Sequence, residues 1–335
     1  MLRFLVMLLS VFIMNVHGEE VHPMKEVLIE ANKALPYQMM FLKDCPEAIP
    51  TIAQWVYDEW SSFDKSLTKD RLVKSLEGRL NDDRIPFTLV AYKEKRPVGV
   101  ITLKEEKNPE FSDFPKDLLW MGTLYVVPDE RKNGLGQALL EWSSLMAMKL
   151  GYEWLYLYIS NPEYVSWYTQ RGAEVIQERT FRDHKIAIMR FDFEKCFAAN
   201  FVGVVPLKKD KGEWKLFLIK NKGFEENWSC PKGQAFLHET SKEAAKRELK
   251  EETNLKVKAF LKKEPILEEF IFVKQGSPTF KKVQFYVAEV EGKVVLQQEA
   301  SADGKWFSLK EAIEITKHPA GKRTLEKVRS KVERL

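Results

Sequence analysis

Apolar positions along the chain switch repeatedly between helical and strand spacing. Recurrence three and four positions apart predicts helices over Ile49–Ser62 and Leu67–Leu80. The next apolar runs have strand length and predict strands over Phe87–Tyr92, Val98–Leu103 and Leu118–Val127. This alternation predicts a mixed unit of helices and strands in the first part of the chain.

The same alternation continues past the middle of the chain. Helical spacing returns over Gly134–Leu150, and Gly151 is a suitable residue to end that helix. A strand, a short helix and two further strands are predicted over Trp154–Ile159, Asn161–Gln170, Glu174–Glu178 and Lys185–Phe191.

A second unit follows without a linker rich in Pro, Gly or Ser. It opens with a strand at Phe201–Pro206, a turn at Asp210–Gly212 and a strand at Trp214–Lys220. Its remaining predicted elements are a charged helix, a strand and two helices, at Ser241–Thr253, Lys281–Glu289, Leu309–Thr316 and Arg323–Val332. This order predicts an α+β unit of single-domain size.

The composition agrees with two globular domains. The chain has 335 residues, about twice the length of an average domain. Its 53 basic and 49 acidic residues are interspersed, so the net charge is only +4. Such a mild excess suits anionic small molecules, and we expect no stable complex with nucleic acid. The three cysteines form no CxxC pair, and their odd number argues against a disulfide framework.

Residues 1–23 have a different character. Arg3 precedes an apolar run from Phe4 to Val16, and Val16-His17-Gly18 resembles a signal-peptide cleavage site. The run is short for a membrane-spanning helix. We interpret the segment either as a secretory signal peptide or as an over-extended start with translation beginning at Met24. The second interpretation places the protein in the cytoplasm and the first exports it; a membrane is a partner only if the segment is retained.

The charged helix of the second unit is the most informative stretch. Thr240 has Glu243 three residues on, which is the spacing of a capping box, so a helix should begin there. Glu248, Glu251 and Glu252 then share one face, where like charges repel. On charge alone, this is an ordinary solvated helix. A divalent cation would reverse the repulsion, because Mg²⁺ prefers hard oxygen ligands.

The spacing around this helix resembles the Nudix box. That pattern is Gly, five residues, Glu, seven residues, Arg-Glu, an apolar residue, any residue, Glu-Glu, any residue, Gly and an apolar residue. The chain matches it at Gly233, Glu239, Arg247, Glu248, Leu249, Glu251, Glu252 and Leu255. Asn254 replaces the terminal Gly, and Asn also tolerates the left-handed conformation expected there. The resemblance covers residues 200–335 and implies an α/β/α sandwich.

Nudix enzymes hydrolyse a nucleoside diphosphate linked to another group, with Mg²⁺ or Mn²⁺. The resemblance implies the catalytic residues Glu239, Arg247, Glu248, Glu251 and Glu252, of which the last three are the metal ligands. Arg247 can tie a carboxylate in place through a bidentate pair, and Glu239 would support the loop or the metal shell. Glu299 is a further candidate ligand or a plain surface residue.

The substrate of this domain is indicated by residues around the box. Trp228-Ser-Cys-Pro-Lys-Gly233 resembles the entry typical of Nudix enzymes that act on dinucleoside or other long polyphosphates. The stretch from Lys281 to Val290 is similar to the diadenosine-tetraphosphate hydrolase group. The implied partner is a nucleoside polyphosphate, with Lys232 and Gly233 near its phosphate oxygens.

In the first unit, a glycine loop lies between a predicted strand and a predicted helix. Gly134 and Gly136 at such a junction let backbone N–H groups point at an anion held on the helix N-terminus. Arg131 and Lys132 add positive charge at the same end. The loop lacks the Gly-Lys-Ser/Thr of a P-loop and the Gly-x-Gly-x-x-Gly of a dinucleotide fold.

This loop resembles motif A of the GCN5-related N-acetyltransferases (GNAT). A second match follows at Asn161 and over residues 167–173, which look like the family's Asn…Leu-Tyr-x-x-x-Gly-Phe segment. The resemblance covers residues 39–193. It implies a mixed, mostly antiparallel central sheet flanked by helices, and acetyl transfer from acetyl-CoA to an amine of a small molecule or a protein.

The GNAT resemblance assigns roles to particular residues. Tyr168 would protonate the leaving thiolate; the alternative interpretation is a core aromatic with a satisfied hydroxyl. Acetyl-CoA would be bound by Leu124, Val126, Arg131, Lys132, Asn133, Gly134, Leu135, Gly136 and Asn161.

The general base is missing from its commonest place, because the strand over residues 118–124 carries no acidic residue. Glu59 and a water relay are the candidates. Trp55, Trp60 and Trp120 could line an acceptor pocket, but core packing is the more usual role.

Together, these patterns predict a bifunctional enzyme with an N-acetyltransferase domain and a Nudix hydrolase domain. One alternative is a hydrolase whose GNAT domain binds acetyl-CoA without catalysis, as a sensor or scaffold. Another is an acetyltransferase with a Nudix-like ligand sensor.

Overall fold

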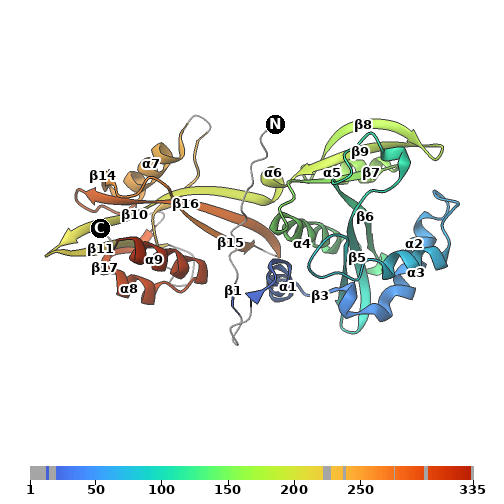
Figure 1. Ribbon diagram of the computed structural model, residues 1–335, viewed down its shortest axis with the longest axis horizontal. Coiled ribbons are helices and arrows are strands. Elements are labelled where there is room, and N and C mark those ends of the chain that lie inside the picture. The colour runs from blue at the N-terminus through green and yellow to red at the C-terminus, as the bar shows by residue number, and fades with distance from the viewer. Residues whose placement is uncertain are drawn as a thin grey trace. The chain divides into compact units, whose positions relative to one another are not determined.

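The computed structural model describes residues 13–14, 20–221, 228–236, 239–274, 276–297 and 301–332. Most of the predicted leader, at 1–12 and 15–19, lies outside these residues, as does Glu299. The chain forms two compact units, which are drawn in Figure 1. The first comprises Met1–Phe197 and Val273–Thr279, and the second comprises Ala198–Phe272 and Phe280–Leu335.

A central sheet organises the first unit. Within the described residues it has seven strands in the order β3-β4-β5-β6-β7-β9-β8. Its strands are β3 (Gln38–Phe41), β4 (Phe87–Lys93), β5 (Arg96–Glu105), β6 (Leu119–Val126), β7 (Trp154–Ile159), β8 (Glu174–Phe181) and β9 (His184–Asp192). Neighbouring strands are antiparallel except β6 and β7, which are parallel.

Helices cover both faces of this sheet. Val100 of β5 packs with Ile52 and Leu76 on one face, whereas Gly99 lies against Leu139 on the other, because successive strand residues alternate in direction. The helices are α1 (Pro23–Ala34), α2 (Ile49–Trp60), α3 (Lys69–Glu77), α4 (Leu135–Lys149), α5 (Pro162–Thr169) and α6 (Phe193–Phe197). Short 3-10 turns occur at η1 (Leu42–Asp44), η2 (Pro46–Ala48), η3 (Pro109–Phe111) and η4 (Pro128–Glu130), and a small ribbon at β1 (Ile13–Met14) and β2 (Glu20–Val21).

The second unit is built around a mixed sheet in which β10 and β16 run parallel over ten residue pairs, from Ala198↔Phe280 to Leu207↔Glu289. Its strands are β10 (Ala198–Asp210), β11 (Glu213–Asn221), β12 (Trp228–Ser229), β13 (Lys232–Gly233), β14 (Lys256–Phe260), β15 (Ile266–Lys274), β16 (Ser277–Glu291) and β17 (Ser301–Ser308). Its helices are α7 (Ser241–Thr253), α8 (Leu309–Ile315) and α9 (Pro319–Val332).

Three layers result, with α7 on one face of the sheet and α8 and α9 on the other (Figure 1). Leu249 of α7 packs with Val204, while Val328 of α9 packs with the next strand residue, Val205. The predicted fold class is therefore confirmed for both units: a mixed, mostly antiparallel sheet flanked by helices, followed by an α/β/α sandwich.

The element predictions agree well with the structure where the pattern was strong. β7 and α7 have the predicted bounds. The prediction omitted α1, which directly follows the segment set aside as a leader. In the described part of the chain, no helix has both the length and the apolar character needed to cross a bilayer.

A buried carboxylate ties α1 to the rest of the first unit. Asp82, whose side chain is 8% exposed, accepts from Lys25 Nζ at 2.9 Å and from Lys43 Nζ at 2.8 Å. Burial acts to raise the pKa of Asp82, but the hydrogen bonds from Lys43 and Lys25 outweigh it and lower the pKa to about 2. A carboxylate with a depressed pKa stabilises the fold above its unfolded pKa.

We predict that Asp82→Asn removes about 2 kcal/mol from the free energy of unfolding of this unit at pH 7. The difference from wild type should shrink as the pH falls from about 4 towards 2, because the wild-type carboxylate is then protonated. Urea unfolding followed by hydrogen exchange in β4 measures it. Asp83→Asn, at the exposed neighbour, is the control; equal pH dependence of both variants would contradict the prediction.

Candidate active sites

Local signals fix both ends of α7. Thr240 Oγ1 accepts from the Glu243 amide at 3.3 Å, and the Glu243 carboxylate accepts from the Thr240 amide at 2.9 Å, which confirms the predicted capping box. At the other end, Asn254 has a φ of 60°, in the left-handed region, and its amide donates to the Lys250 carbonyl at 2.8 Å. The expected role of Asn254 as the end of the helix is also confirmed, and the carboxylates of α7 are held in a defined register.

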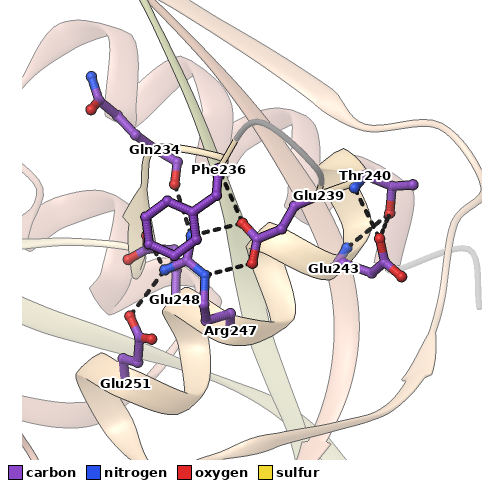
Figure 2. A network of polar contacts seen from close by, with 8 residues as sticks. All are labelled: Gln234, Phe236, Glu239, Thr240, Glu243, Arg247, Glu248 and Glu251. Carbon is purple, nitrogen blue, oxygen red and sulfur yellow. Dashed lines mark hydrogen bonds and ion pairs between the residues drawn. The ribbon is translucent and has the colours of Figure 1, made fainter.

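One guanidinium connects the acidic side chains at this site (Figure 2). Arg247 Nε and Nη2 donate to the two oxygens of Glu239, at 2.7 and 3.0 Å. Its Nη1 donates to Glu248 at 2.7 Å and to Glu251 at 3.0 Å. Nη2 also donates to the carbonyl of Gln234 at 2.8 Å. Arg247 thus bridges three carboxylates and fixes the loop before the helix.

One side of this cluster is shielded by an aromatic ring. The Arg247 guanidinium lies 3.9 Å from the centre of the Phe236 ring, and its side chain is 19% exposed. The hydrogen bond to Glu239, with those to Glu248 and Glu251, raises the pKa of Arg247 well above its usual range. The pKa of Glu239 is lowered by Arg247 and by the Phe236 amide, which donates to it at 3.0 Å. Arg247 and Glu239 therefore stabilise each other in their ionised forms.

The position of Glu248 explains the glycine at residue 233. A Cβ on Gly233 would lie only 2.1 Å from Glu248 Cδ and 2.2 Å from each of its carboxylate oxygens. No side chain fits there while Glu248 keeps its place. The first glycine of the sequence pattern therefore makes room for the carboxylate of the helix.

Glu252 points to a different partner. Its Oε2 accepts from the backbone amide of Lys232 at 2.9 Å. Burial raises the pKa of Glu252 to about 7, against the lowering effect of the Lys232 amide and side chain; Glu248 and Glu251 raise it further. When a carboxylate is buried next to other carboxylates, a nearby cation strongly stabilises its charged form.

Within the described ranges, no three His, Cys, Asp or Glu side chains are gathered so as to hold a metal ion. Glu248 and Glu251 are engaged by Arg247, and Glu252 by Lys232. The donor set nevertheless suits Mg²⁺ or Mn²⁺, because it consists of hard carboxylate oxygens crowded beside a glycine cradle. The assignment of Glu248, Glu251 and Glu252 as metal ligands therefore stays a prediction, as does that of Glu299, which lies outside the described residues.

Two further charged residues lie near Lys232 that motif spacing did not single out. Lys232 Nζ donates to Ser229 Oγ at 3.0 Å. Burial lowers the pKa of Lys281, and the charge of Lys232 lowers it further. Burial raises the pKa of Glu268, which Lys232 opposes. These residues come from β13, β15 and β16, so only the tertiary fold brings them together.

In the first unit, the glycine loop leads from the end of β6 into α4. Lys132 and Gly134 have φ angles of 67° and 84°, so the loop turns twice through the left-handed region. Gly134 is the N-cap of α4 and provides no side-chain cap. The first amides of α4 therefore have no capping side chain, which is the arrangement that favours an anion.

Arg131 lies beneath this loop and closes it onto β6. Its Nε donates to the Val126 carbonyl at 2.9 Å, and its guanidinium lies 5.4 Å from the centre of the Tyr125 ring. Arg131 also forms an ion pair with Glu59 at 3.4 Å. Glu59, the candidate base, is thus placed at the loop end of β6.

β6 has a free edge next to the loop. It pairs with β7 at a single position, Trp120↔Tyr156, whereas on its other side it pairs with β5 from Leu119 to Val126. Leu124 and Val126 therefore have no β7 partner in the described residues. The Val126 carbonyl is engaged by Arg131, so the backbone groups of Leu124 are the ones that an extended ligand could pair with.

Tyr168 lies beside this free edge. Its hydroxyl is 3.9 Å from Met121 Sδ, and the residue is 6% exposed. Burial raises the pKa of Tyr168, with a smaller contribution from Tyr164, and Arg171 opposes the shift. The phenol therefore keeps its proton at neutral pH and is a proton donor. Asn161, nearby in sequence, uses Oδ1 to cap α5 by accepting from the Glu163 amide at 2.8 Å.

The tryptophans proposed for an acceptor pocket are packed against other aromatic rings. Trp55 stacks on Tyr125 with ring centres 5.4 Å apart, and Trp60 meets the same ring edge-on at 6.3 Å. Trp120 is 1% exposed and lies in a cluster with Phe111 and Phe114. Core packing, the plainer of the two interpretations, describes these contacts.

Comparisons with known proteins agree with this division. A family model of the NUDIX domain matches residues 200–328, and a model of the acetyltransferase (GNAT) domain matches residues 85–172. No curated protein matches the chain.

Solved structures of Nudix proteins are similar to the second unit. One is the binary complex of an Ap4A hydrolase from C. elegans, with 23% identity over 41% of this chain and 100% of that chain, and a TM-score of 0.33. Another is the dihydroneopterin triphosphate pyrophosphohydrolase of E. coli, with 17% identity over 38% of this chain and 92% of that chain, and a TM-score of 0.30.

The Arg247 network predicts how the loop responds to a mutation. Arg247→Lys keeps the charge but loses the planar fork that bridges Glu239 to the Gln234 carbonyl. Amide exchange at Phe236 and Glu239 should rise about tenfold or more, because charge-assisted hydrogen bonds of roughly 1.5–3 kcal/mol are lost. Exchange at Leu249, inside α7, should stay within about twofold. Unchanged protection at Phe236 would show that Arg247 does not hold this loop.

Proposed function

Because the chain carries a GNAT acetyltransferase domain followed by a NUDIX domain, we propose that it is a bifunctional enzyme. In this proposal, residues 200–335 hydrolyse a nucleoside diphosphate-linked compound of the dinucleoside polyphosphate type. Residues 39–193 transfer acetyl from acetyl-CoA to an amine of a small molecule or a protein. Both proposed substrates are cytosolic metabolites, so we place the enzyme in the cytoplasm.

The observation that carries the hydrolase proposal is the clamp of Arg247 on Glu239, Glu248 and Glu251. It keeps the carboxylates of α7 beside Gly233 despite their mutual repulsion. Glu248, Glu251 and Glu252 would hold the divalent cation, which supplies neutralisation of phosphate charge and activation of water when bound. Lys232, with the nearby Lys281, would bind the phosphate oxygens and orient the polyphosphate.

We predict that the chain, incubated with Mg²⁺ or Mn²⁺ and a panel of nucleoside polyphosphates, releases phosphorylated products detectable by ³¹P NMR. Glu251→Gln should lower kcat/KM at least about 100-fold, because mutation of a residue that only hydrogen-bonds to a metal ligand already lowers metal affinity or activity by roughly 10–100-fold. Glu326→Gln makes the same charge change at an exposed position of α9 and should retain activity. No product from any nucleotide, with identical behaviour of Glu251→Gln, would contradict the hydrolase assignment.

The acetyltransferase proposal rests on the glycine loop, the free edge of β6 and the buried Tyr168. Acetyl-CoA supplies the thioester acyl group when bound. The amides from Arg131 to Gly136 would bind its pyrophosphate, and Leu124 and Val126 would align its extended arm. Tyr168, protonated at neutral pH, would give its proton to the leaving thiolate.

One observation favours the alternative in which this domain binds acetyl-CoA without catalysis. β6 carries no acidic residue, and Glu59 is engaged by Arg131. A sensor would bind acetyl-CoA in calorimetry and release no CoA with any amine. Binding of acetyl-CoA together with release of CoA in the presence of an amine would instead support an acetyltransferase.

Tyr168 provides the sharper test. Tyr168→Phe should lower the rate of acetyl transfer by about 100-fold or more, the size typical of a general acid, while acetyl-CoA binding changes little. Tyr164→Phe is the matched control, since Tyr164 is on the same helix and 46% exposed. Equal rates for the two variants would show that Tyr168 is a packing residue.

A further inference from the structure

β6 is irregular at one residue beside its free edge. Its pairing with β5 is regular up to Thr102↔Thr123 and resumes at Leu103↔Met121, so Gly122 is an extra residue without a partner on β5. Such a bulge re-aims the strand and leaves a backbone amide outside the ladder. It lies one residue from Met121, whose sulfur is next to the Tyr168 hydroxyl.

A lysine side chain lies directly across this bulge. A Cβ built on Gly122 would be 2.9 Å from Lys104 Cε, 3.1 Å from Cδ and 3.3 Å from Cγ. The Lys104 stem thus occupies the space that a side chain at residue 122 would take. The amine of Lys104 is one bond further on and therefore close to the bulge.

Lys104 and Tyr168 approach β6 from opposite faces. Leu103 pairs with Met121, the residue in contact with Tyr168, and Lys104 pairs with Trp120. Neighbouring residues of a strand point to opposite faces. An acyl group at the bulge would thus have the proton donor for its leaving group on one side and an amine on the other.

A buried carboxylate fixes the Lys104 amine. Glu106, whose side chain is 9% exposed, accepts from Lys104 Nζ at 2.9 Å. It also accepts from the amides of Lys107 and Asn108, each at 2.9 Å, which hold the carboxylate in place. Lys104 itself is 24% exposed. The arrangement is an oriented primary amine with a proton acceptor beside it.

We propose that Lys104 is a self-acetylation site of this domain, with Glu106 as its proton acceptor; the proposal rests on the proposed acetyltransferase. The Lys104 nitrogen forms a bond to the acetyl carbon as the carbon–sulfur bond of acetyl-CoA breaks. Glu106 takes a proton from the ammonium, Tyr168 protonates the thiolate, and a second proton of the nitrogen passes to water, from which Tyr168 is reprotonated. The products are acetyl-lysine, CoA and one proton. Glu106 thereby fills the role of base that no residue of β6 supplies.

Acetylation would also change the site. An acetyl-lysine carries no charge and cannot keep the ion pair with Glu106.

The test is peptide mapping of the full chain after incubation with acetyl-CoA. Lys104 should be acetylated at least about tenfold faster than Lys107, an exposed lysine just after β5 that reports uncatalysed reaction. The rate constant should not depend on protein concentration, because Lys104 would react with acetyl-CoA bound to its own chain. Tyr168→Phe and Glu106→Gln should each reduce Lys104 labelling towards that of Lys107, and Tyr164→Phe should not.

A second measurement needs no cofactor. In brief labelling of the chain with acetic anhydride, Lys104 should react more slowly than Lys107, since its amine donates to Glu106 and its side chain is only 24% exposed, and Glu106→Gln should speed the reaction. Equal reactivity of Lys104 in both proteins would overturn the proposed pairing.

Calorimetry with acetyl-CoA separates the two possible failures. If acetyl-CoA binds but Lys104 is labelled no faster than Lys107, self-acetylation is wrong and the acetyltransferase proposal stands. If acetyl-CoA does not bind, both proposals are wrong.

Discussion

The second unit depends on the compensation of negative charge on one helix. Glu248 and Glu251 lie one turn apart on α7, and Glu239 approaches them from the preceding loop. Such carboxylates repel one another unless a cation lies between them. Arg247 provides that charge, and its fork also binds the Gln234 carbonyl, so neutralisation and loop position come from a single side chain. The capping box, the Asn254 end and the space above Gly233 all keep this arrangement in register.

The first unit solves the opposite electrostatic problem with its backbone. In the proposed acetyltransferase its loop would bind an anion through amides, which requires a helix that begins without a capping side chain and a strand that leaves its neighbour. β6 provides the second condition by pairing with β7 only at Trp120. The bulge at Gly122 lies where β6 separates from β7, two residues after Trp120. The residues of the proposed acetyl transfer lie around this point, where the regular strand pairing ends.

Local interactions explain how far the sequence could predict these sites. Thr240, Glu243 and Asn254 act within one or two turns of α7, so the bounds of the helix followed from spacing alone. The direction of each carboxylate could not be predicted from spacing, because the contacts of Lys232 and Gln234 with α7 form only in the tertiary structure. Residue type alone made Glu59 a candidate general base. Its ion pair with Arg131 is a tertiary contact that the sequence does not reveal. Lys104 and Glu106 lie between the predicted strands Val98–Leu103 and Leu118–Val127, outside every predicted element, and only the β5–β6 register shows what Lys104 faces.

The central claim is that the carboxylates of α7 around Arg247 form a binding site for a divalent cation. Titration of the full chain with Mn²⁺, followed by electron paramagnetic resonance, tests it most directly. The account predicts that protein-bound Mn²⁺ appears and that Glu248→Gln greatly weakens the binding, with the fold unchanged by circular dichroism. If the folded chain binds no Mn²⁺ at millimolar concentration, the carboxylates of α7 form a structural ion-pair network and the account of the site is wrong.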